Sequence, residues 1–258
     1  MKKITAAISL CLLVPVLASA TVFIRRAGHT DYTGTLTCVW LMTSDGTETD
    51  VAGDEDLTES GSDDIPTNAD DPFTSSSTSR LFAESDDEWL ESADGAGDSD
   101  ITGTAISVGG WFKFSSDTSS DQTVIAKFSA SNEQYNLKHD DGADRIEFML
   151  SADGSANTTG YSSSGFAAYG DGDWHHIVGV YNGSNIVIYI DGSTDGSPVN
   201  FSSSLYAGDA DLRIGQDANG NNEFDGYAYQ CFVHAGALTS DQITEIMTYG
   251  IKGLQGVY

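Results

Sequence analysis

Apolar and polar positions alternate in short runs along most of the chain, and this alternation predicts β-strands. The clearest run is 106–114, in which every second residue lies on the same face of a strand. Similar runs predict strands at 36–42, 123–128, 135–138, 145–150, 174–181, 186–190, 212–215 and 223–233. Residues 182–185, Asn-Gly-Ser-Asn, separate two of these runs and form a hairpin signal. Short strands with Gly, Asn and Asp turns between them are typical of an antiparallel sandwich.

One helix is expected near the C-terminal end. Thr239 and Gln242 fit the first and last positions of a capping box. Ile243 and Ile246 then recur with helical spacing, and Gly250 is a typical residue at which a helix ends. The predicted fold is therefore all-β, an antiparallel jelly-roll β-sandwich with one short C-terminal helix.

The first 20 residues have the layout of a secretory signal peptide. Lys2 and Lys3 precede an apolar stretch at 4–17, and Ala-Ser-Ala at 18–20 resembles a cleavage site. An N-terminal strand or a retained anchor is the alternative interpretation. We expect a signal peptide at 1–20, a leader segment at 21–34, one domain at 35–258, and no transmembrane span in the mature chain. The protein is then secreted or extracellular.

Acidic residues dominate the charge of the 258-residue chain. It has 39 Asp and Glu against 11 Lys and Arg, and its formal net charge is −28. Residues 45–100 hold 19 of these acids, with Arg80 as the only basic residue among them. Phosphates would be repelled by such a surface, so nucleic acid is excluded as a partner. The charge favours association with cations, although it does not determine a fold.

A set of motifs in a fixed order carries a resemblance to a known family. The most specific are Asp173-Trp-His-His-Ile-Val178 and Ile188-Tyr-Ile-Asp-Gly192. The others are Trp40, Asp56-Leu-Thr58, Arg80-Leu-Phe82, Asp86-Asp-Glu-Trp-Leu-Glu91, Ile106-Ser-Val-Gly-Gly-Trp-Phe-Lys113, Leu212-Arg-Ile-Gly215, Phe224-Asp-Gly226 and Ala237-Leu-Thr-Ser240. Together they resemble the laminin-G-like jelly rolls of the concanavalin A-like lectin/glucanase superfamily. The resemblance covers most of residues 35–250 and implies a single domain of that fold.

Two cysteines, Cys38 and Cys231, remain after removal of the predicted signal peptide. An even number in an exported chain favours a disulfide, and two buried free thiols are the alternative. The resemblance implies that the first and last strands are antiparallel neighbours in one sheet. It therefore implies a Cys38–Cys231 disulfide.

Calcium is the cofactor that the sequence favours. The loop at 217–225 offers side-chain oxygens at alternate positions, from Asp217, Asn219, Asn221, Glu223 and Asp225. It lacks the turn glycine of an EF-hand, and a polar hairpin loop without a metal is the alternative. In the family that the chain resembles, calcium is held by an aspartate on the last strand. The matching position here is Tyr229, preceded by Ala228. Asp45, Asp50 and Asp54 are further acidic candidates.

Five aromatic residues are predicted to contact a ligand, namely Trp89, Tyr161, Phe166, Tyr169 and Tyr206. Trp89 lies among acids, and the others lie in Gly- and Ser-rich segments, where binding residues are common. The alternative is that these rings only anchor the loops.

Catalytic signals are weak. Glu84 and Glu88 have the spacing of a carboxylate pair on a strand, as retaining glycosidases require, but no apolar residues separate them. The sequence contains no G-x-S-x-G, H-E-x-x-H or C-x-x-C motif. His175 and His176 are adjacent on a predicted strand and should point to opposite faces, which prevents them from sharing a metal.

The sequence thus predicts a secreted, non-enzymatic binding or adhesion module that recognises a glycan or an extracellular protein through loops at one rim. The alternative is a structural subunit of an extracellular filament, assembly or virus-particle surface, with a homo-oligomer as its product. A glycoside hydrolase is the third reading.

Overall fold

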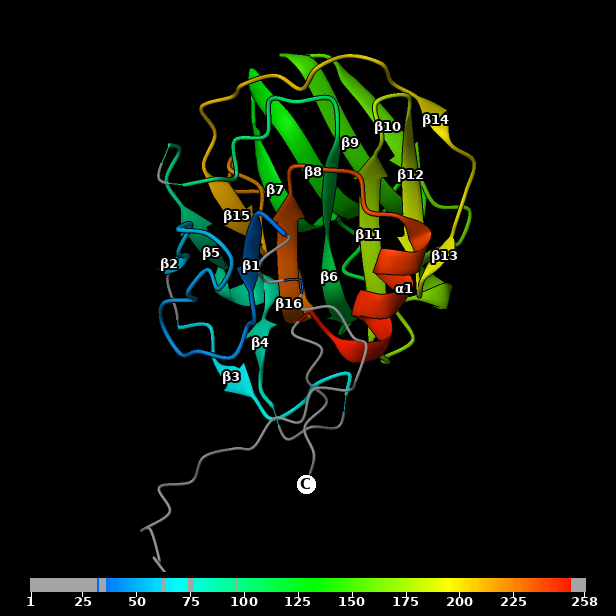
Figure 1. Ribbon diagram of the computed structural model, residues 1–258. Helices are drawn as coiled ribbons and strands as arrows, with labels where there is room; N and C mark the ends of the chain where they lie inside the picture. Colours follow the sequence, from blue (N-terminus) through cyan, green and yellow to red (C-terminus); the bar gives the residue numbers. More distant parts are fainter. Residues whose placement is uncertain (1–31, 33–35, 62–63, 74–76, 96, 252–258) are drawn as a thin grey trace, which may run out of the picture.

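The computed structural model describes residues 32, 36–61, 64–73, 77–95 and 97–251. Within these residues, two antiparallel sheets stack face to face, and one α-helix lies outside them (Figure 1). The predicted signal peptide at 1–20 lies outside the described residues, as does all of the leader at 21–34 except Tyr32. No helix in the described part of the chain has the length and apolar character needed to cross a membrane.

The first sheet has nine strands among the described residues, with the central order β13-β12-β11-β6-β16-β4-β3. β1 also pairs with β16, and β14 pairs with β12. These strands are β1 (Cys38–Trp40), β3 (Thr67–Asn68), β4 (Ser79–Phe82), β6 (Ile106–Phe114), β11 (His175–Tyr181), β12 (Asn185–Ile190), β13 (Ser193–Thr194), β14 (Val199–Asn200) and β16 (Gly226–His234).

The second sheet has seven strands in the described chain, in the order β10-β9-β8-β7-β15-β5-β2. They are β2 (Thr58–Gly61), β5 (Glu88–Ser92), β7 (Gln122–Ser129), β8 (Asn132–Asp140), β9 (Arg145–Gly154), β10 (Asn157–Tyr161) and β15 (Leu212–Ile214). Two 3₁₀ turns occupy Glu84–Asp86 and Phe166–Ala168.

The core lies between the two sheets. In the second sheet, directly opposed residues on five neighbouring strands all point into it, namely Leu90, Ile214, Ile125, Leu137 and Phe148. The first sheet meets this row closely at Gly179, where an added Cβ would lie 2.4 Å from Cγ of Phe148. Such an approach is possible only without a side chain, so Gly179 sets the spacing of the sheets at this point.

The helix α1 (Ser240–Tyr249) lies against the outer side of the first sheet (Figure 1). Its buried residues Ile243 and Ile246 pack in a second apolar cluster with Val178 and Phe232 of that sheet. The predicted capping box is confirmed, because the Thr239 hydroxyl accepts the amide of the third helical residue and that residue's side chain binds back. The jelly-roll sandwich with one C-terminal helix is confirmed as well.

The acidic segment that follows β1 folds around buried polar groups. Arg80 is fully buried, and its guanidinium donates to the carboxylate of Glu59 and to the carbonyl of Ser44. Asp50 accepts the backbone amides of Val39 and Ala52 at 2.8 and 2.9 Å. Several acids of this segment therefore stabilise loops by accepting backbone hydrogen bonds.

The predicted disulfide is not formed, and this expectation is corrected: Cys38 and Cys231 are buried free thiols. The strands that carry them are antiparallel neighbours, as the resemblance implied, but Cys231 lies opposite Trp40 and Cys38 opposite Val233. The two cysteines are thus diagonal neighbours. Diagonal Cα atoms lie about 7–8 Å apart, which exceeds the usual span of a disulfide, about 4.4–6.8 Å.

Candidate functional site

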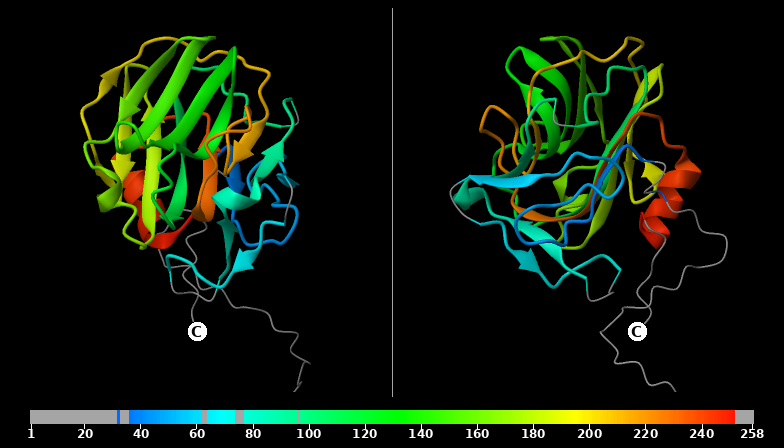
Figure 2. Two further views of the ribbon diagram at one scale, coloured as in Figure 1. Left: turned by 180° about the vertical axis from the view of Figure 1, so that it is seen from behind. Right: turned by 60° about the vertical axis from the view of Figure 1, so that its left-hand side comes forward.

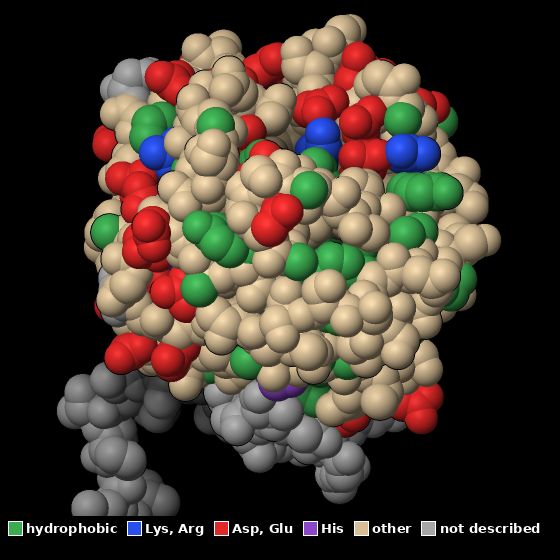
Figure 3. Space-filling view, turned by 90° about the horizontal axis from the view of Figure 1, so that it is seen from above, with side chains coloured by type: hydrophobic (Ala, Val, Ile, Leu, Met, Phe, Trp, Pro, Cys, Tyr) green, Lys and Arg blue, Asp and Glu red, His purple; other side chains and the backbone are tan. Residues whose placement is uncertain are grey.

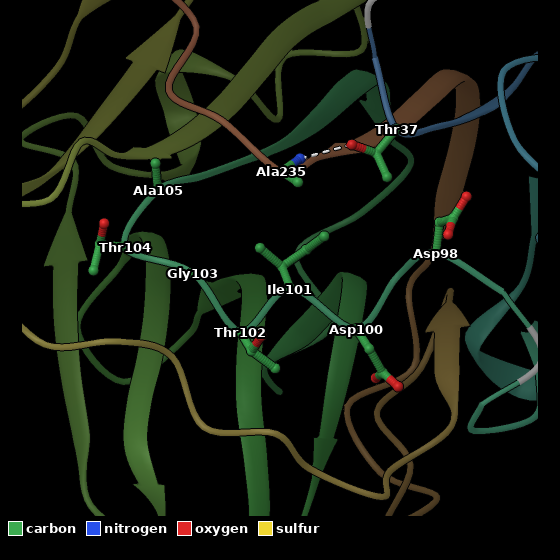
Figure 4. A pocket seen from close by; sticks show the side chains of 9 residues that line it. All are labelled: Thr37, Asp98, Asp100, Ile101, Thr102, Gly103, Thr104, Ala105 and Ala235. Atoms are coloured by element: carbon green, nitrogen blue, oxygen red, sulfur yellow. Dashed lines mark hydrogen bonds between the residues drawn. The ribbon is translucent and has the colours of Figure 1, made fainter.

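One depression opens at an end of the sandwich (Figure 4). Its volume is about 500 Å³, and the segment 98–105 lies along one side, with Thr37 and Ala235 on the other. The amide of Ala235 donates to the Thr37 hydroxyl at 2.8 Å. Asp100 lies 3.0 Å from the ammonium of the buried Lys127. The lining contains hydroxyl and carboxylate oxygens but no aromatic ring, so it offers no stacking surface for a ligand.

The outer face of the second sheet offers such surfaces. The left view of Figure 2 looks at this sheet from behind, and no helix covers its strands. Because side chains alternate along a strand, residues next to the core-facing row point outwards. One outward row runs Glu91, Arg213, Ala126, Asn136, Met149 and Thr159 through directly opposed partners. Trp89 and Tyr161 belong to the same outer face, near its two edges.

Trp89 is fixed by two charged neighbours. The guanidinium carbon of Arg213 lies 4.5 Å from the centre of the Trp89 ring, and Trp89 Nε1 donates to Glu91 at 2.6 Å. Glu91 also accepts the Ser60 hydroxyl at 2.7 Å and lies 3.2 Å from Arg213. Burial alone would raise the pKa of Glu91, but the hydrogen bonds from Trp89 and Ser60, together with Arg213, hold it below its ordinary value. The indole is therefore held rigidly beside a carboxylate and a guanidinium.

Tyr161 forms a similar pair at the opposite edge. Tyr161 is 40% exposed. Among the described residues, it is the one large hydrophobic residue that is exposed rather than buried or half-buried. The guanidinium carbon of Arg145 lies 4.2 Å from the Tyr161 ring centre. Glu147 anchors that guanidinium with contacts of 2.6 and 2.9 Å. In both pairs a carboxylate neutralises the arginine, which leaves an aromatic plate with hydrogen-bonding groups around it.

Polar atoms between the two pairs are buried without a partner. Asn136 Oδ1 and Thr123 Oγ1 have no hydrogen-bond partner within the described residues. Asn136 lies opposite Met149 and Ala126, and Thr123 lies opposite Lys138, all on the outward side. Buried polar atoms normally find a partner. A water molecule enclosed beside these atoms would supply one.

The predicted ligand residues are thus separated into different places. Trp89 and Tyr161 share the outer face, five strand spacings apart, which is about 24 Å. Phe166 and Tyr169 instead pack with Phe114 beside the core, with ring centres 5.6–5.7 Å apart. Tyr206 lies against Gly154, at the turn between β9 and β10. Arg145 and Arg213 were not predicted, because strand register alone places them beside the rings.

The predicted calcium loop is held by its own hydrogen bonds. Asp217 is buried, and its Oδ1 accepts the amides of Asn219 at 2.9 Å and Asn221 at 3.3 Å. The carboxylate of Glu223 accepts a glutamine amide at 3.1 Å, and that of Asp225 accepts a serine hydroxyl at 2.6 Å. Calcium binding in this loop stays a prediction.

The other acidic candidates differ in burial. Asp50 is buried in the loop that follows β1, whereas Asp45 and Asp54 are exposed. Glu84 is exposed in a 3₁₀ turn, and Glu88 is buried at the start of β5, where it accepts a backbone amide at 2.9 Å. A turn therefore separates Glu84 from Glu88, and they do not share a strand face.

His175 and His176 point to opposite faces of β11, as predicted. His175 lies opposite Phe112 and contacts Asp191 at 2.8 Å and Asp171 at 3.1 Å. His176 lies opposite Trp111, and their ring centres are 5.2 Å apart. Each histidine thus has its own environment.

A second aromatic group lies on the outer side of the first sheet. Tyr227 is half-buried there, with its ring centre 6.2 Å from that of Trp174. The ammonium of Lys113 lies 5.4 Å from the Tyr227 ring centre and 2.9 Å from Asp70. This group resembles the two aromatic–arginine pairs but lies on the other sheet.

The charged side chains on the face seen from above are mainly acidic (Figure 3). Seen from above in Figure 3, acidic side chains gather around the margin, and the few visible basic side chains lie beside acidic ones. Electrostatic attraction of an anionic ligand is therefore weak over this surface.

Comparisons with known proteins agree with the fold. Residues 85–244 match a laminin-G-like family model, described as concanavalin A-like lectin/glucanases superfamily. No curated protein matches the chain in sequence.

Two kinds of solved structure are similar to it. The binding domain of botulinum neurotoxin DC, in complex with rat synaptotagmin II, shares 12% identity at a TM-score of 0.63, over 84% of this chain and 52% of that one. A second similar structure is of botulinum neurotoxin type C, a toxin whose cell entry depends on interaction with two ganglioside molecules. It shares 15% identity at a TM-score of 0.60, over 84% of this chain and 51% of that one. Domain 4 of AbnA, a GH43 extracellular arabinanase from Geobacillus stearothermophilus, in complex with arabinotriose, shares 15% identity at a TM-score of 0.57, over 82% and 98%. The chain spans about half the length of the neurotoxin chains.

Proposed function

The chain belongs to the laminin-G-like family of the concanavalin A-like lectin/glucanases superfamily, and from this membership we propose that it is a binding module for a neutral oligosaccharide. The ligand lies across the outer face of the second sheet, and no reaction follows binding. The observation that carries this proposal is Tyr161, exposed on an uncovered sheet face and stacked against an arginine that a carboxylate neutralises.

The chemistry of this face suits sugars. Aromatic plates pack against the apolar faces of sugar rings, and the carboxylates and amide oxygens beside them can accept hydroxyl hydrogens. Glu91, whose side chain is partly exposed beside Trp89, is one such acceptor. Trp89 and Tyr161 are too far apart for one sugar ring to touch both, which favours an extended oligosaccharide.

The net charge argues for a neutral ligand. At −28, the chain repels anionic glycans over most of its surface. Glu147 and Glu91 neutralise Arg145 and Arg213. This is why we propose an uncharged sugar rather than the charged headgroup of a ganglioside, and why arabinotriose, the ligand of the arabinanase domain, is a useful probe.

An immobilised glycan panel that includes arabinotriose, followed by calorimetric titration of each glycan retained, tests the proposal. For a glycan long enough to span both rings, we expect Tyr161→Ala and Trp89→Ala each to weaken binding at least about fivefold, which corresponds to a loss of about 1 kcal/mol. Tyr227→Ala is the matched control, because it removes a ring under a cation on the other sheet and should leave the affinity unchanged. Retention of no neutral glycan, or an equal loss in the control, would contradict the proposal.

We also propose that the module acts outside the cell, as the signal-peptide pattern at 1–20 indicates. Intact-mass measurement of the exported protein should show a chain that begins after Ala20. A chain that keeps residues 1–20 would contradict export by cleavage.

A further inference from the structure

Three potential ligand side chains meet at one end of the second sheet. Asp117 lies in the loop between β6 and β7, His139 lies near the end of β8, and Asp141 lies in the turn that follows. One ligand atom from each residue lies within 4.8 Å of the other two. Three separate chain positions thus converge on a volume that one metal ion can occupy.

His139 is held in a fixed orientation. Its side chain is buried. The centre of the imidazole ring lies 5.0 Å from the ring centre of Phe166 and 6.3 Å from that of Phe114. Its Nδ1 lies 2.9 Å from the hydroxyl of Tyr169. The tautomer with a proton on Nδ1 donates to that hydroxyl and leaves a lone pair on Nε2.

Nε2 of His139 is the unexplained atom of this region. It is buried and has no hydrogen-bond partner among the described residues. Since Tyr169 occupies Nδ1, Nε2 is the nitrogen left for the carboxylates of Asp117 and Asp141. A buried ring nitrogen without a partner is costly, and a metal ion would remove that cost.

The local charge also favours a cation. Asp121, Asp140 and Asp144 lie close to the same end of the sheet, and Lys138 pairs with Asp121 and Asp140. One lysine therefore faces a larger group of acids. Burial lowers the pKa of His139, although the nearby aspartates oppose the shift.

We propose that Asp117, His139 and Asp141 bind a divalent transition-metal ion, with Zn²⁺ as the ion that this donor set fits best. One imidazole nitrogen and two carboxylates are ligands that Zn²⁺ accepts, with water in the fourth position. Calcium prefers oxygen ligands alone, so the histidine disfavours it. Tyr169 is the outer partner that orients the imidazole. This site is separate from the predicted calcium loop and does not depend on the proposed glycan face.

Calorimetric titration of the metal-free, full-length protein with Zn²⁺ tests the site. We expect one Zn²⁺ per chain in the wild type. Asp117→Asn and Asp141→Asn keep the shape of the side chain and should each weaken Zn²⁺ binding by more than tenfold. Tyr169→Phe should weaken it about 10–100-fold, the usual effect of losing an outer partner.

Asp209→Asn is the matched control. Asp209 is exposed and follows Gly208, which lies beside Asn132 at the opposite end of β8. The Asp209→Asn variant should therefore bind Zn²⁺ with the same affinity as the wild type. An equal loss in Asp209→Asn, unchanged binding in the Asp117 and Asp141 variants, or displacement of Zn²⁺ from the wild-type site by an equal concentration of Ca²⁺ would overturn the proposal.

Nuclear magnetic resonance of the imidazole nitrogens provides a second measurement that needs no substitution in the core. Addition of Zn²⁺ should shift the Nε2 resonance of His139 strongly while Nδ1 keeps the signature of a protonated nitrogen. An unshifted Nε2 at saturating Zn²⁺ would overturn the assignment.

Discussion

Arg80 is a single basic residue that organises a long acidic segment. It is fully buried, and its guanidinium is shared between the carboxylate of Glu59 and carbonyl oxygens in the loop after β1. Removing one partner of a buried ion pair leaves the other uncompensated, which costs more than the pair itself contributes.

We therefore expect Arg80→Met to lower the free energy of unfolding by about 3–5 kcal/mol. Arg213→Met, which removes a partly exposed guanidinium stacked on Trp89, should cost about 1 kcal/mol. Urea unfolding followed by tryptophan fluorescence measures both. Similar losses in the two variants would show that Arg80 has no special structural role.

His176 gives the molecule a defined response to acid. Its ring is buried against Trp111, both nitrogens lack hydrogen-bond partners within the described chain, and burial lowers its pKa to about 4, against an opposing effect of Asp191. The unfolded chain takes up this proton near pH 6.5 and the folded chain does not. This residue's contribution to stability is therefore lost as pH falls from about 6.5 towards 4.

His176→Phe should remove that contribution. Between pH 7 and pH 4.5 the wild type should lose about 2–3 kcal/mol more stability than the variant, as measured by urea unfolding at both pH values. Hydrogen bonds to Asp191 and Asp171 raise the pKa of His175, so protonation of this residue stabilises the fold below its ordinary pKa. His175 is present in both proteins, so its contribution to the pH dependence cancels in the comparison. Parallel losses in the two proteins would contradict this assignment.

At the scale of single elements, Gly179 on β11 shows how closely the two sheets approach. An added Cβ would lie 2.4 Å from the ring of Phe148, a buried side chain that cannot move away freely. Steric overlap in a packed core is destabilising even when it involves a single methyl group.

Gly179→Ala should accordingly lower the free energy of unfolding by about 1–3 kcal/mol. Gly103→Ala is the control, because nothing lies within 4 Å of its added Cβ and the change restricts only the unfolded chain. Thermal unfolding should show a lower midpoint for the first variant and an unchanged or slightly higher one for the second. A midpoint for Gly179→Ala equal to the wild type would mean that the sheets can separate locally.

The sequence predicted the long strands well because each has one apolar face. The runs at 106–114 and 145–150 became β6 and most of β9, and the Asn-Gly turn at 182–185 joins β11 to β12 as expected. Polar edge strands were missed. β2 and β10 have no apolar alternation, since their side chains lie at sheet margins, so only pairing with a neighbour reveals them.

The candidate sites were harder to predict because they depend on register across strands. Trp89 and Tyr161 could be named from sequence, but Arg213 and Arg145 could not be placed beside them without knowing which strands pair. In the same way, Asp117 and His139 lie 22 positions apart in the chain, and only the fold brings them together.

At the scale of the whole molecule, Cys38 and Cys231 lie on adjacent strands, which are the first and the last strand of the described chain. Both thiols are buried, and burial raises the pKa of each. A high pKa suppresses the thiolate, which is the reactive form.

We expect neither thiol to react with a disulfide reagent in the native protein and both to react in urea without a reductant. Intact mass under non-reducing conditions should match two free thiols at these positions. A mass lower by two hydrogens, or thiols that react only after reduction, would show a Cys38–Cys231 bond in the purified protein.

The pairing of β1 with β16 also governs when the fold can form. Residues near position 39 contact partners near position 232, and β16 further separates β6 from β4 in the centre of the first sheet. Closing a loop of that length costs conformational entropy. Contacts this distant in sequence also give a high contact order, which is associated with slow folding. A ribosome or an export channel releases β16 after all the other strands of the two sheets, so the first sheet lacks its central strand until β16 has emerged. The sandwich can then be completed only after β16 has emerged, on the far side of any membrane that the chain crosses unfolded.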